Sequence, residues 1–220
     1  MSERDGGPRA LLVDYGGVLT TPVAESMTAW AGSDGIDYEG FRDVLAEWFG
    51  AAYGDGGQES PVHAVERGEV TVPEFERELA ARLRTHAGGP VTPDGLLRRM
   101  FSGFDLVPAM YDVVRKAKAA GLRTGLLSNS WGADTYVRDG WDELFDAVVV
   151  SGEVGMRKPE ERIYRRAAEM LGLPPEECVF VDDISVNVRA ARHFGMTAVH
   201  HQTPDETMEE LETALGLPLR

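Results

Sequence analysis

Cysteine is nearly absent from the 220-residue sequence, in which Cys178 is the single example. An intrachain disulfide is therefore excluded, and so is a metal site built from cysteine alone. No apolar run reaches about 18 residues, the length that crosses a bilayer. Residues 1–9 are polar and lack the apolar stretch of a signal peptide. We therefore expect a soluble, cytoplasmic protein that is not exported and does not bind membranes.

Positive charge is also scarce. The 22 basic residues face 37 acidic ones, which gives a formal net charge of −15. Such a surface repels the phosphates of nucleic acids and anionic lipids. We expect no nucleic-acid or membrane partner, although a small anion can still bind where local groups reverse the field.

Apolar runs alternate with helical patterns from Asp105 onward. Alternation of this kind is typical of a parallel sheet whose strands are joined by right-handed helical crossovers. The expected strands are residues 10–13, 122–127, 147–150, 179–181 and 197–200. The expected helices include residues 108–120, 159–171 and 185–194, each followed by a glycine that can end it. The sequence predicts an α/β fold, a Rossmann-like parallel sheet with helices on both faces.

Residues 21–104 have a different pattern, with apolar residues at helical spacing and no series of strands. We interpret them as an α-helical domain inserted after the first strand, over the carboxyl edge of the sheet. Residues 1–20 and 105–220 then form the core domain. The aromatic residues of the insertion fit a core of its own, a pocket lining or, where exposed, a homodimer interface.

Polar side chains follow four of the expected strands. They are Asp14, the Ser128-Asn129-Ser130 segment, Lys158, and the Asp182-Asp183 pair. Each alone is typical of a helix cap or a turn, but all four are expected at one edge of the sheet, where ligands of open α/β sheets bind. Carboxylates from two strands and a backbone carbonyl make an oxygen site suited to Mg²⁺. Lys158 and the metal would neutralise a phosphoryl group that Asp14 attacks.

At these residues the sequence resembles the haloacid dehalogenase-like hydrolase superfamily. The first motif is similar to Asp14-Tyr15-Gly16-Gly17-Val18, the second to Leu126-Leu127-Ser128-Asn129, the third to Lys158, and the fourth to Val181-Asp182-Asp183 with Asn187. More narrowly, residues 128–131, 154–160 and 180–184 resemble the phosphatase domain at the amino end of soluble epoxide hydrolases and its bacterial relatives. The resemblance covers nearly the whole chain and implies that the helical insertion is a cap that selects the substrate.

The resemblance also implies a role for each matched residue. It makes Asp14 the nucleophile, Ser128 a donor to a phosphoryl oxygen with Asn129 beside it, and Lys158 the stabiliser of charge. The implied cofactor is Mg²⁺ and the implied substrate a small phosphorylated metabolite. The implied metal ligands are Asp14, the Gly16 carbonyl and Asp183, with Asp182 and Asn187 in support.

Gly16 departs from the family pattern, because phosphatases of this superfamily carry a second aspartate there that protonates the leaving group. General acid–base help is worth typically about 10²- to 10⁴-fold in rate. Three readings stay open: a phosphatase that is slow or uses another proton donor, a 2-haloacid-type dehalogenase, and a non-hydrolytic member that binds a phospho-ligand or a protein. His63 and Glu66 are candidate donors, although we expect both on a solvated helix face. We likewise expect a solvated Arg157.

Overall fold

A computed structural model describes residues 7–53, 60–132 and 136–219. Its centre is a five-stranded parallel sheet with the strand order β3-β2-β1-β4-β5. The strands are β1 (Ala10–Val13), β2 (Arg123–Ser128), β3 (Ala147–Val150), β4 (Cys178–Asp182) and β5 (Thr197–His200). The predicted α/β fold with a parallel sheet is therefore confirmed.

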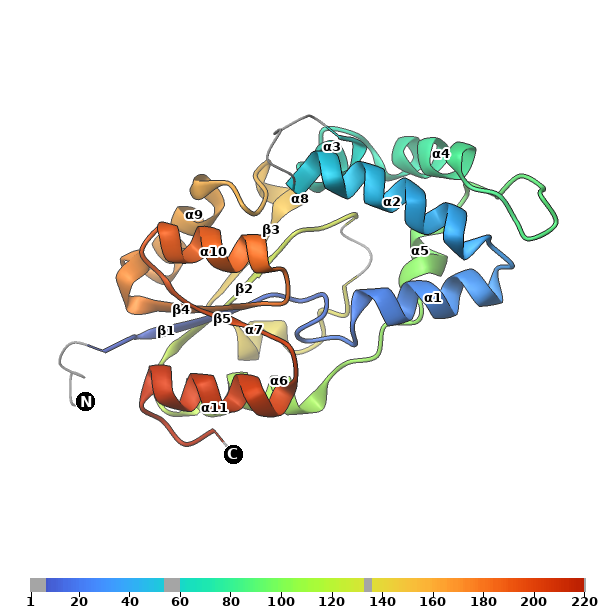
Figure 1. Ribbon diagram of the computed structural model, residues 1–220. Helices are drawn as coiled ribbons and strands as arrows, with labels where there is room; N and C mark the ends of the chain where they lie inside the picture. The colour runs from blue at the N-terminus through green and yellow to red at the C-terminus, as the bar shows by residue number, and fades with distance from the viewer. Residues whose placement is uncertain (1–6, 54–59, 133–135, 220) are drawn as a thin grey trace.

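Helices cover both faces of the sheet, because successive strand residues point to opposite sides. Leu11 and Val13 of β1 pack with one set of helices, while Ala10 and Leu12 pack with the other. The first set is α6 (Pro108–Ala119), α7 (Trp141–Leu144) and α11 (Pro204–Leu215). The second includes α9 (Glu161–Leu171) and α10 (Ser185–His193). Figure 1 shows these two layers above and below the strands. Burial on both faces explains why the strands are almost continuously apolar.

Two short helices complete the core. They are α8 (Ser151–Val154), which follows β3, and the 3₁₀ helix η2 (Pro175–Glu177), which precedes β4. The helix expected from residue 159 begins two residues later, at Glu161, because residues 157–160 form a turn closed by the Glu160 N–H on the Arg157 carbonyl at 2.8 Å. This turn carries Lys158 to the sheet edge.

Among the described residues, five helices lie between β1 and α6 and form the group at the other end of the molecule in Figure 1. They are α1 (Val23–Ser33), α2 (Tyr38–Tyr53), α3 (Pro61–Glu66), α4 (Val72–Arg82) and α5 (Leu96–Phe101). Their buried residues form an apolar cluster of their own, which includes Trp30, Phe41 and Trp48. The aromatic residues of this segment therefore serve mainly as its core.

The two chain segments that join this helical group to the sheet run side by side. Thr20 forms an isolated antiparallel bridge with Leu106, and the Val107 N–H donates to the Leu19 carbonyl at 2.9 Å. This pairing supports the division that we propose, in which residues 21–104 form an inserted cap and residues 1–20 and 105–220 form the core domain. No helix in the described ranges is long and apolar enough to span a membrane.

Candidate active site

The carboxyl ends of β2, β1 and β4 lie next to one another in the middle of the sheet. Val13 is in register with Leu126 of β2 and with Val181 of β4, so Asp14, directly after β1, and Asp182, the last residue of β4, lie at the same level. The Asp14 N–H donates to the Val181 carbonyl at 2.9 Å, which extends the ladder by one residue. The structure thus brings these two acids together at the edge where parallel sheets bind ligands.

Lys158 lies at the centre of the site and is fully buried. Its Nζ is 2.9 Å from Asp14 Oδ2 and 2.6 Å from Asp182 Oδ2. Its backbone is held by the Asn129 side chain, whose Oδ1 accepts from the Lys158 N–H at 2.8 Å and whose Nδ2 donates to the Lys158 carbonyl at 3.0 Å. Asn129 therefore fixes the lysine in place with its amide group.

Asp182 is surrounded by hydrogen-bond donors. Besides Lys158, its carboxylate accepts from the Ile184 N–H at 2.7 Å and from Asn187 Nδ2 at 3.1 Å to both oxygens. Asp182 thus bonds the lysine and the backbone before α10, and Asn187 bonds Asp182.

Asp183 is placed differently. No side-chain hydrogen bond or ion pair joins its carboxylate to another residue within the described ranges. It lies against the turn after β1, because a Cβ at Gly17 would be only 2.3 Å from Asp183 Oδ2. Gly17 has a φ of +74°, so glycine is needed there both for the turn and for the close approach. Asp183 is left available to a ligand.

The site has too little positive charge for its acids. Carboxylate oxygens of Asp14, Asp182 and Asp183 all lie within 4.8 Å of one another. Burial raises the pKa of Asp14 to about 8 against the opposing effect of Lys158, and burial with the nearby Asp182 charge raises the pKa of Asp183 to about 6. Burial opposes charge on Lys158, but Asp14 and Asp182 together hold its pKa above the ordinary value. Carboxylate oxygens gathered in this way, with a single ammonium beside them, fit a divalent cation such as Mg²⁺.

Ser128 ends β2 and is buried beside these groups. Its Oγ accepts a hydrogen bond from the Tyr136 hydroxyl at 3.0 Å, while its own contact to the Asn129 carbonyl is long, at 3.4 Å. Burial raises the pKa of Tyr136 to about 12, so this hydroxyl stays protonated at neutral pH. The Ser128 proton is therefore available for a better acceptor. Sequence reasoning missed Tyr136, which no motif marks.

Gly16 has room for a side chain. An added Cβ would meet only Val23 Cγ2 at 3.6 Å, an ordinary contact, and the residue does not have a positive φ. Neither backbone conformation nor packing therefore requires glycine at this position.

Three expectations of solvent exposure were wrong. His63, Glu66 and Arg157 are all buried. Glu66 Oε2 accepts from Arg157 Nε at 2.5 Å, and Glu66 Oε1 accepts from Trp131 Nε1 at 3.4 Å. The spacing of Val62, Val65 and Glu66 on one helical face was a signal that could have indicated burial. Because both oxygens of Glu66 are engaged, it does not fit the role of alternative proton donor.

These geometric features agree with the result of comparison with known proteins. A family model described as haloacid dehalogenase-like hydrolase matches residues 8–195. The chain belongs to this family. The predicted family is thereby confirmed, and with it the class of hydrolases.

Two relatives of this haloacid dehalogenase-like hydrolase have recorded activities in their names. It is 27% identical to bifunctional epoxide hydrolase 2 of Sus scrofa, in an alignment that covers 96% of this chain and 39% of the relative. It is 30% identical to phosphoserine phosphatase of Thermus thermophilus, in an alignment that covers 82% of this chain and 59% of the relative. The chain thus spans less than two thirds of either relative.

The fold also matches solved structures. A haloacid dehalogenase family enzyme of Bacteroides thetaiotaomicron, crystallised as a magnesium complex, superimposes with a TM-score of 0.64 at 23% identity, covering 89% of this chain and 94% of the other. At this level of identity the likeness shows a common fold.

Proposed function

We propose that this hydrolase is a Mg²⁺-dependent phosphatase of a small phosphorylated metabolite, with Asp14 as the nucleophile. The observation that carries the proposal is the buried Lys158 ammonium 2.9 Å from the Asp14 carboxylate, in a cluster that also holds the Asp183 carboxylate. The phosphoserine phosphatase among the relatives and the magnesium in the similar solved structure support it.

In this proposal an Asp14 oxygen attacks phosphorus, the bond from phosphorus to the leaving oxygen breaks, and an aspartyl phosphate forms. Lys158 favours the ionised form of Asp14 against burial, which raises the Asp14 pKa to about 8, and it balances the added negative charge. The hydroxyl of Ser128 donates to a phosphoryl oxygen, as its long contact to the Asn129 carbonyl leaves it free to do. Water then attacks phosphorus and loses a proton to solvent, the bond between phosphorus and the Asp14 oxygen breaks, and inorganic phosphate leaves with Asp14 regenerated.

The metal ligands in this proposal are Asp14, Asp183 and the Gly16 carbonyl. When bound, Mg²⁺ supplies positive charge that offsets repulsion between the carboxylates and the phosphoryl group. Asp182 contributes negative charge nearby, but its oxygens are already bonded to Lys158, Ile184 and Asn187.

Gly16 gives the proposal a specific consequence for the substrate. With no side chain at this position, the leaving oxygen receives its proton from solvent or leaves as an anion. The reaction therefore favours phosphate esters with acidic leaving groups, such as aryl or acyl phosphates, over simple alkyl esters.

The same absence favours a second candidate, a 2-haloacid-type dehalogenase, because a halide leaves without protonation. Asp183 argues against it. A carboxylate held beside Asp14 repels a carboxylic acid substrate unless a cation lies between them. A phospho-ligand or protein-binding member without turnover is the third candidate.

The test is a panel of phosphomonoesters assayed with and without Mg²⁺, beside 2-haloacids without metal. We expect Mg²⁺-dependent release of phosphate that becomes faster as the leaving group becomes more acidic, and none after Asp14→Asn. Turnover of 2-haloacids alone would favour the dehalogenase. Binding of orthovanadate with Mg²⁺ but no turnover of any ester would favour the non-hydrolytic candidate.

A further inference from the structure

A buried ion pair joins the cap to the residue that precedes Lys158. Glu66, the last residue of α3, accepts from Arg157 Nε at 2.5 Å across 91 positions of sequence. The two side chains are only 3% and 4% exposed. Removal of one partner from an ion pair that is so well shielded from solvent destabilises the folded state, because the other partner is left as an uncompensated buried charge.

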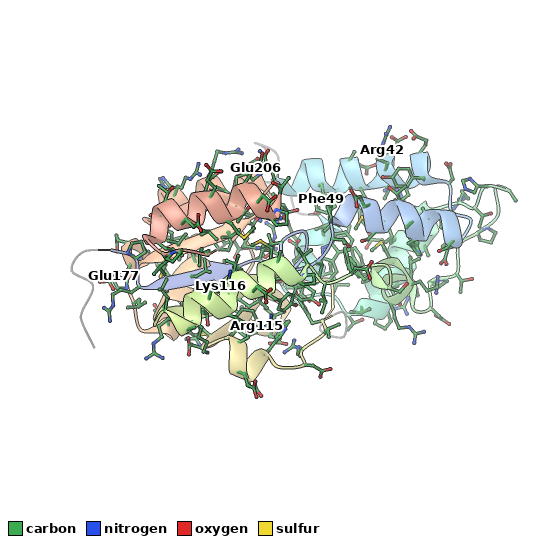
Figure 2. The ribbon with its side chains drawn as sticks, turned by 90° about the horizontal axis from the view of Figure 1, so that it is seen from below. Arg42, Phe49, Arg115, Lys116, Glu177 and Glu206 are labelled. Atoms are coloured by element: carbon green, nitrogen blue, oxygen red, sulfur yellow. The ribbon has the colours of Figure 1, made fainter. Side chains whose placement is uncertain are left out.

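The same glutamate reaches the loop after β2. Its Oε1 accepts from Trp131 Nε1 at 3.4 Å, and Trp131 directly follows the Ser128-Asn129-Ser130 segment. The Trp131 ring stacks on Phe49 of α2 at 5.6 Å between centroids and meets Phe75 of α4 edge to face at 5.4 Å. Figure 2 shows Phe49 where the cap meets the core, while Arg42 of the same helix lies on the outer side. Glu66 is therefore bonded to two core segments that border the candidate site.

The end of α3 also rests directly on the core. Gly68 has a φ of +69°, and a Cβ there would be 2.7 Å from the Gly152 carbonyl oxygen of α8. Next to it, Arg67 Nη1 donates to Glu160 Oε1 at 3.0 Å. Figure 1 shows α3 and α8 close together at this junction. The cap thus contacts both ends of the turn that presents Lys158, at Arg157 and at Glu160.

At its ammonium end Lys158 is held by Asp14 and Asp182. Its backbone is held by the Asn129 amide on one side, while on the other side Arg157 is held by Glu66. A misplacement of about 1 Å at a reacting centre can cost about 100-fold in rate. A shift of Arg157 would therefore move the adjacent Lys158 and change the position of its ammonium group.

We propose that Glu66 is a positioning residue through which the cap sets the place of Lys158, by way of the Arg157 side chain. The catalytic consequence rests on the proposed phosphatase function, whereas the structural consequence does not. Glu66 acts through Arg157 and has no contact with the reacting atoms in this proposal.

The first test follows the Lys158 ammonium by NMR, without any need for activity. The sequence contains three lysines, Lys116, Lys118 and Lys158, so a nitrogen–proton spectrum of lysine side chains is simple, and Lys158→Arg identifies the signal that is lost. Glu66→Gln is expected to shift or broaden the Lys158 signal and to leave those of Lys116 and Lys118 in place. Glu66→Asp, which keeps the charge and shortens the reach, should give a smaller shift.

Glu76→Gln is the matched control. Glu76 is also a buried glutamate of the cap, but it accepts from the Gly95 and Leu97 N–H groups within the cap and does not reach the core. Its replacement should weaken the cap without moving the Lys158 signal. An unchanged Lys158 signal in folded Glu66→Gln or Glu66→Asp, or an equal shift in Glu76→Gln, would overturn the proposal.

The second test is kinetic and is made well below the unfolding temperature of each variant. Glu66→Gln is expected to lower kcat about 10- to 100-fold with little change in KM, Glu66→Asp to restore part of it, and Glu76→Gln to leave both constants as they were. Equal kcat in Glu66→Gln and wild type would contradict the catalytic part. A wild-type protein without phosphatase activity would instead contradict the proposed function, and the NMR result alone would then decide the role of Glu66.

Discussion

Lys158 places its ammonium 2.9 Å from Asp14 Oδ2, close enough to form an ion pair with the proposed nucleophile. The same ammonium is 2.6 Å from Asp182 Oδ2, so a single cation serves two buried carboxylates. Asp183 adds a third acid within 4.8 Å of both. An excess of negative charge is therefore built into the site, and it is relieved only when a cation binds or a carboxylate takes up a proton.

Replacement of Asp183 should stabilise the metal-free protein at high pH. Its pKa is raised to about 6 by burial and by Asp182, above the ordinary value of 3.8. A carboxyl whose pKa is raised in the folded state binds more protons when the protein is folded than when it is unfolded. Asp183 therefore has no effect on the free energy of unfolding below about pH 4 and destabilises the folded state fully above about pH 6. Asp183→Asn should add roughly 2 kcal/mol to the free energy of unfolding at pH 8 and almost nothing at pH 4, measured by urea denaturation in EDTA.

The same experiment with Mg²⁺ tests the metal site. Bound metal stabilises the folded state by mass action, so Mg²⁺ should raise the stability of the wild type at pH 8 and have a much smaller effect on Asp183→Asn. The exposed Asp43 of α2 provides the control, since Asp43→Asn should change neither the pH dependence nor the response to Mg²⁺. Equal responses of Asp183→Asn and wild type would remove Asp183 from the proposed ligands.

An aspartate at position 16 should restore a proton donor. A Cβ added at this position meets only Val23 Cγ2 at 3.6 Å, so Gly16→Asp is expected to fold. Its kcat should rise by about 100-fold or more on alkyl phosphates, which need protonation of the leaving oxygen, and far less on aryl phosphates. Steady-state assays over a series of leaving groups measure both effects.

Gly16→Asn is the matched control, because asparagine has nearly the same shape as aspartic acid but its amide is not acidic enough to protonate a leaving group. Equal rates for Gly16→Asp and Gly16→Asn would show that the gain, if any, is not acid catalysis. Gly17→Ala should behave quite differently and lose activity, since its Cβ would collide with Asp183 Oδ2 at 2.3 Å.

The sheet and the edge position of Asp14 were predictable because both follow from local patterns. The apolar run before Asp14 predicts a buried strand, and the two glycines after Asp14, Gly16 and Gly17, predict the turn. Val179 to Val181 before Asp182-Asp183 is the same pattern, and in both cases the strand expected from the sequence is within one residue of the one observed. The carboxyl ends of parallel strands then meet without further information.

The burial of Glu66 and Arg157 was not predictable in this way. Charged residues are mostly exposed, and nothing near either residue in the sequence names a partner 91 positions away. Only the docking of α3 on the turn after α8 brings them together. Tyr136 was missed for the same reason, since its contact with Ser128 depends on how the chain folds back after β2.

Gly68→Ala should weaken the contact between the end of α3 in the cap and α8 in the core. The left-handed backbone conformation costs alanine about 1 to 2 kcal/mol of conformational free energy. The alanine Cβ would also lie 2.7 Å from the Gly152 carbonyl oxygen. Gly88→Ala is the control, with a similar φ of +75° and nothing within 4 Å. Thermal unfolding should show a clearly larger loss for Gly68→Ala, together with a lower kcat. A similar loss in both variants would mean that only the backbone strain matters.

Tyr136→Phe should lower the rate through Ser128. The Tyr136 hydroxyl donates to Ser128 Oγ at 3.0 Å, and the loss of one such hydrogen bond corresponds to a decrease of about 3- to 10-fold in kcat. In the Ser128→Ala background the same change should have almost no further effect, because its target is gone. Independent, multiplying effects in the double variant would place the role of Tyr136 elsewhere.

The most direct test of the account is the location of the phosphoryl group during turnover. Since Gly16 leaves no base to activate water, the aspartyl phosphate should form faster than it is hydrolysed on an aryl phosphate with Mg²⁺. Acid quenching and mass spectrometry of peptides are expected to find the phosphoryl group on Asp14, with an initial burst of phenolate that matches the enzyme concentration and disappears in Asp14→Asn. Turnover with no phosphoryl group on Asp14, or an unchanged burst in Asp14→Asn, would contradict it.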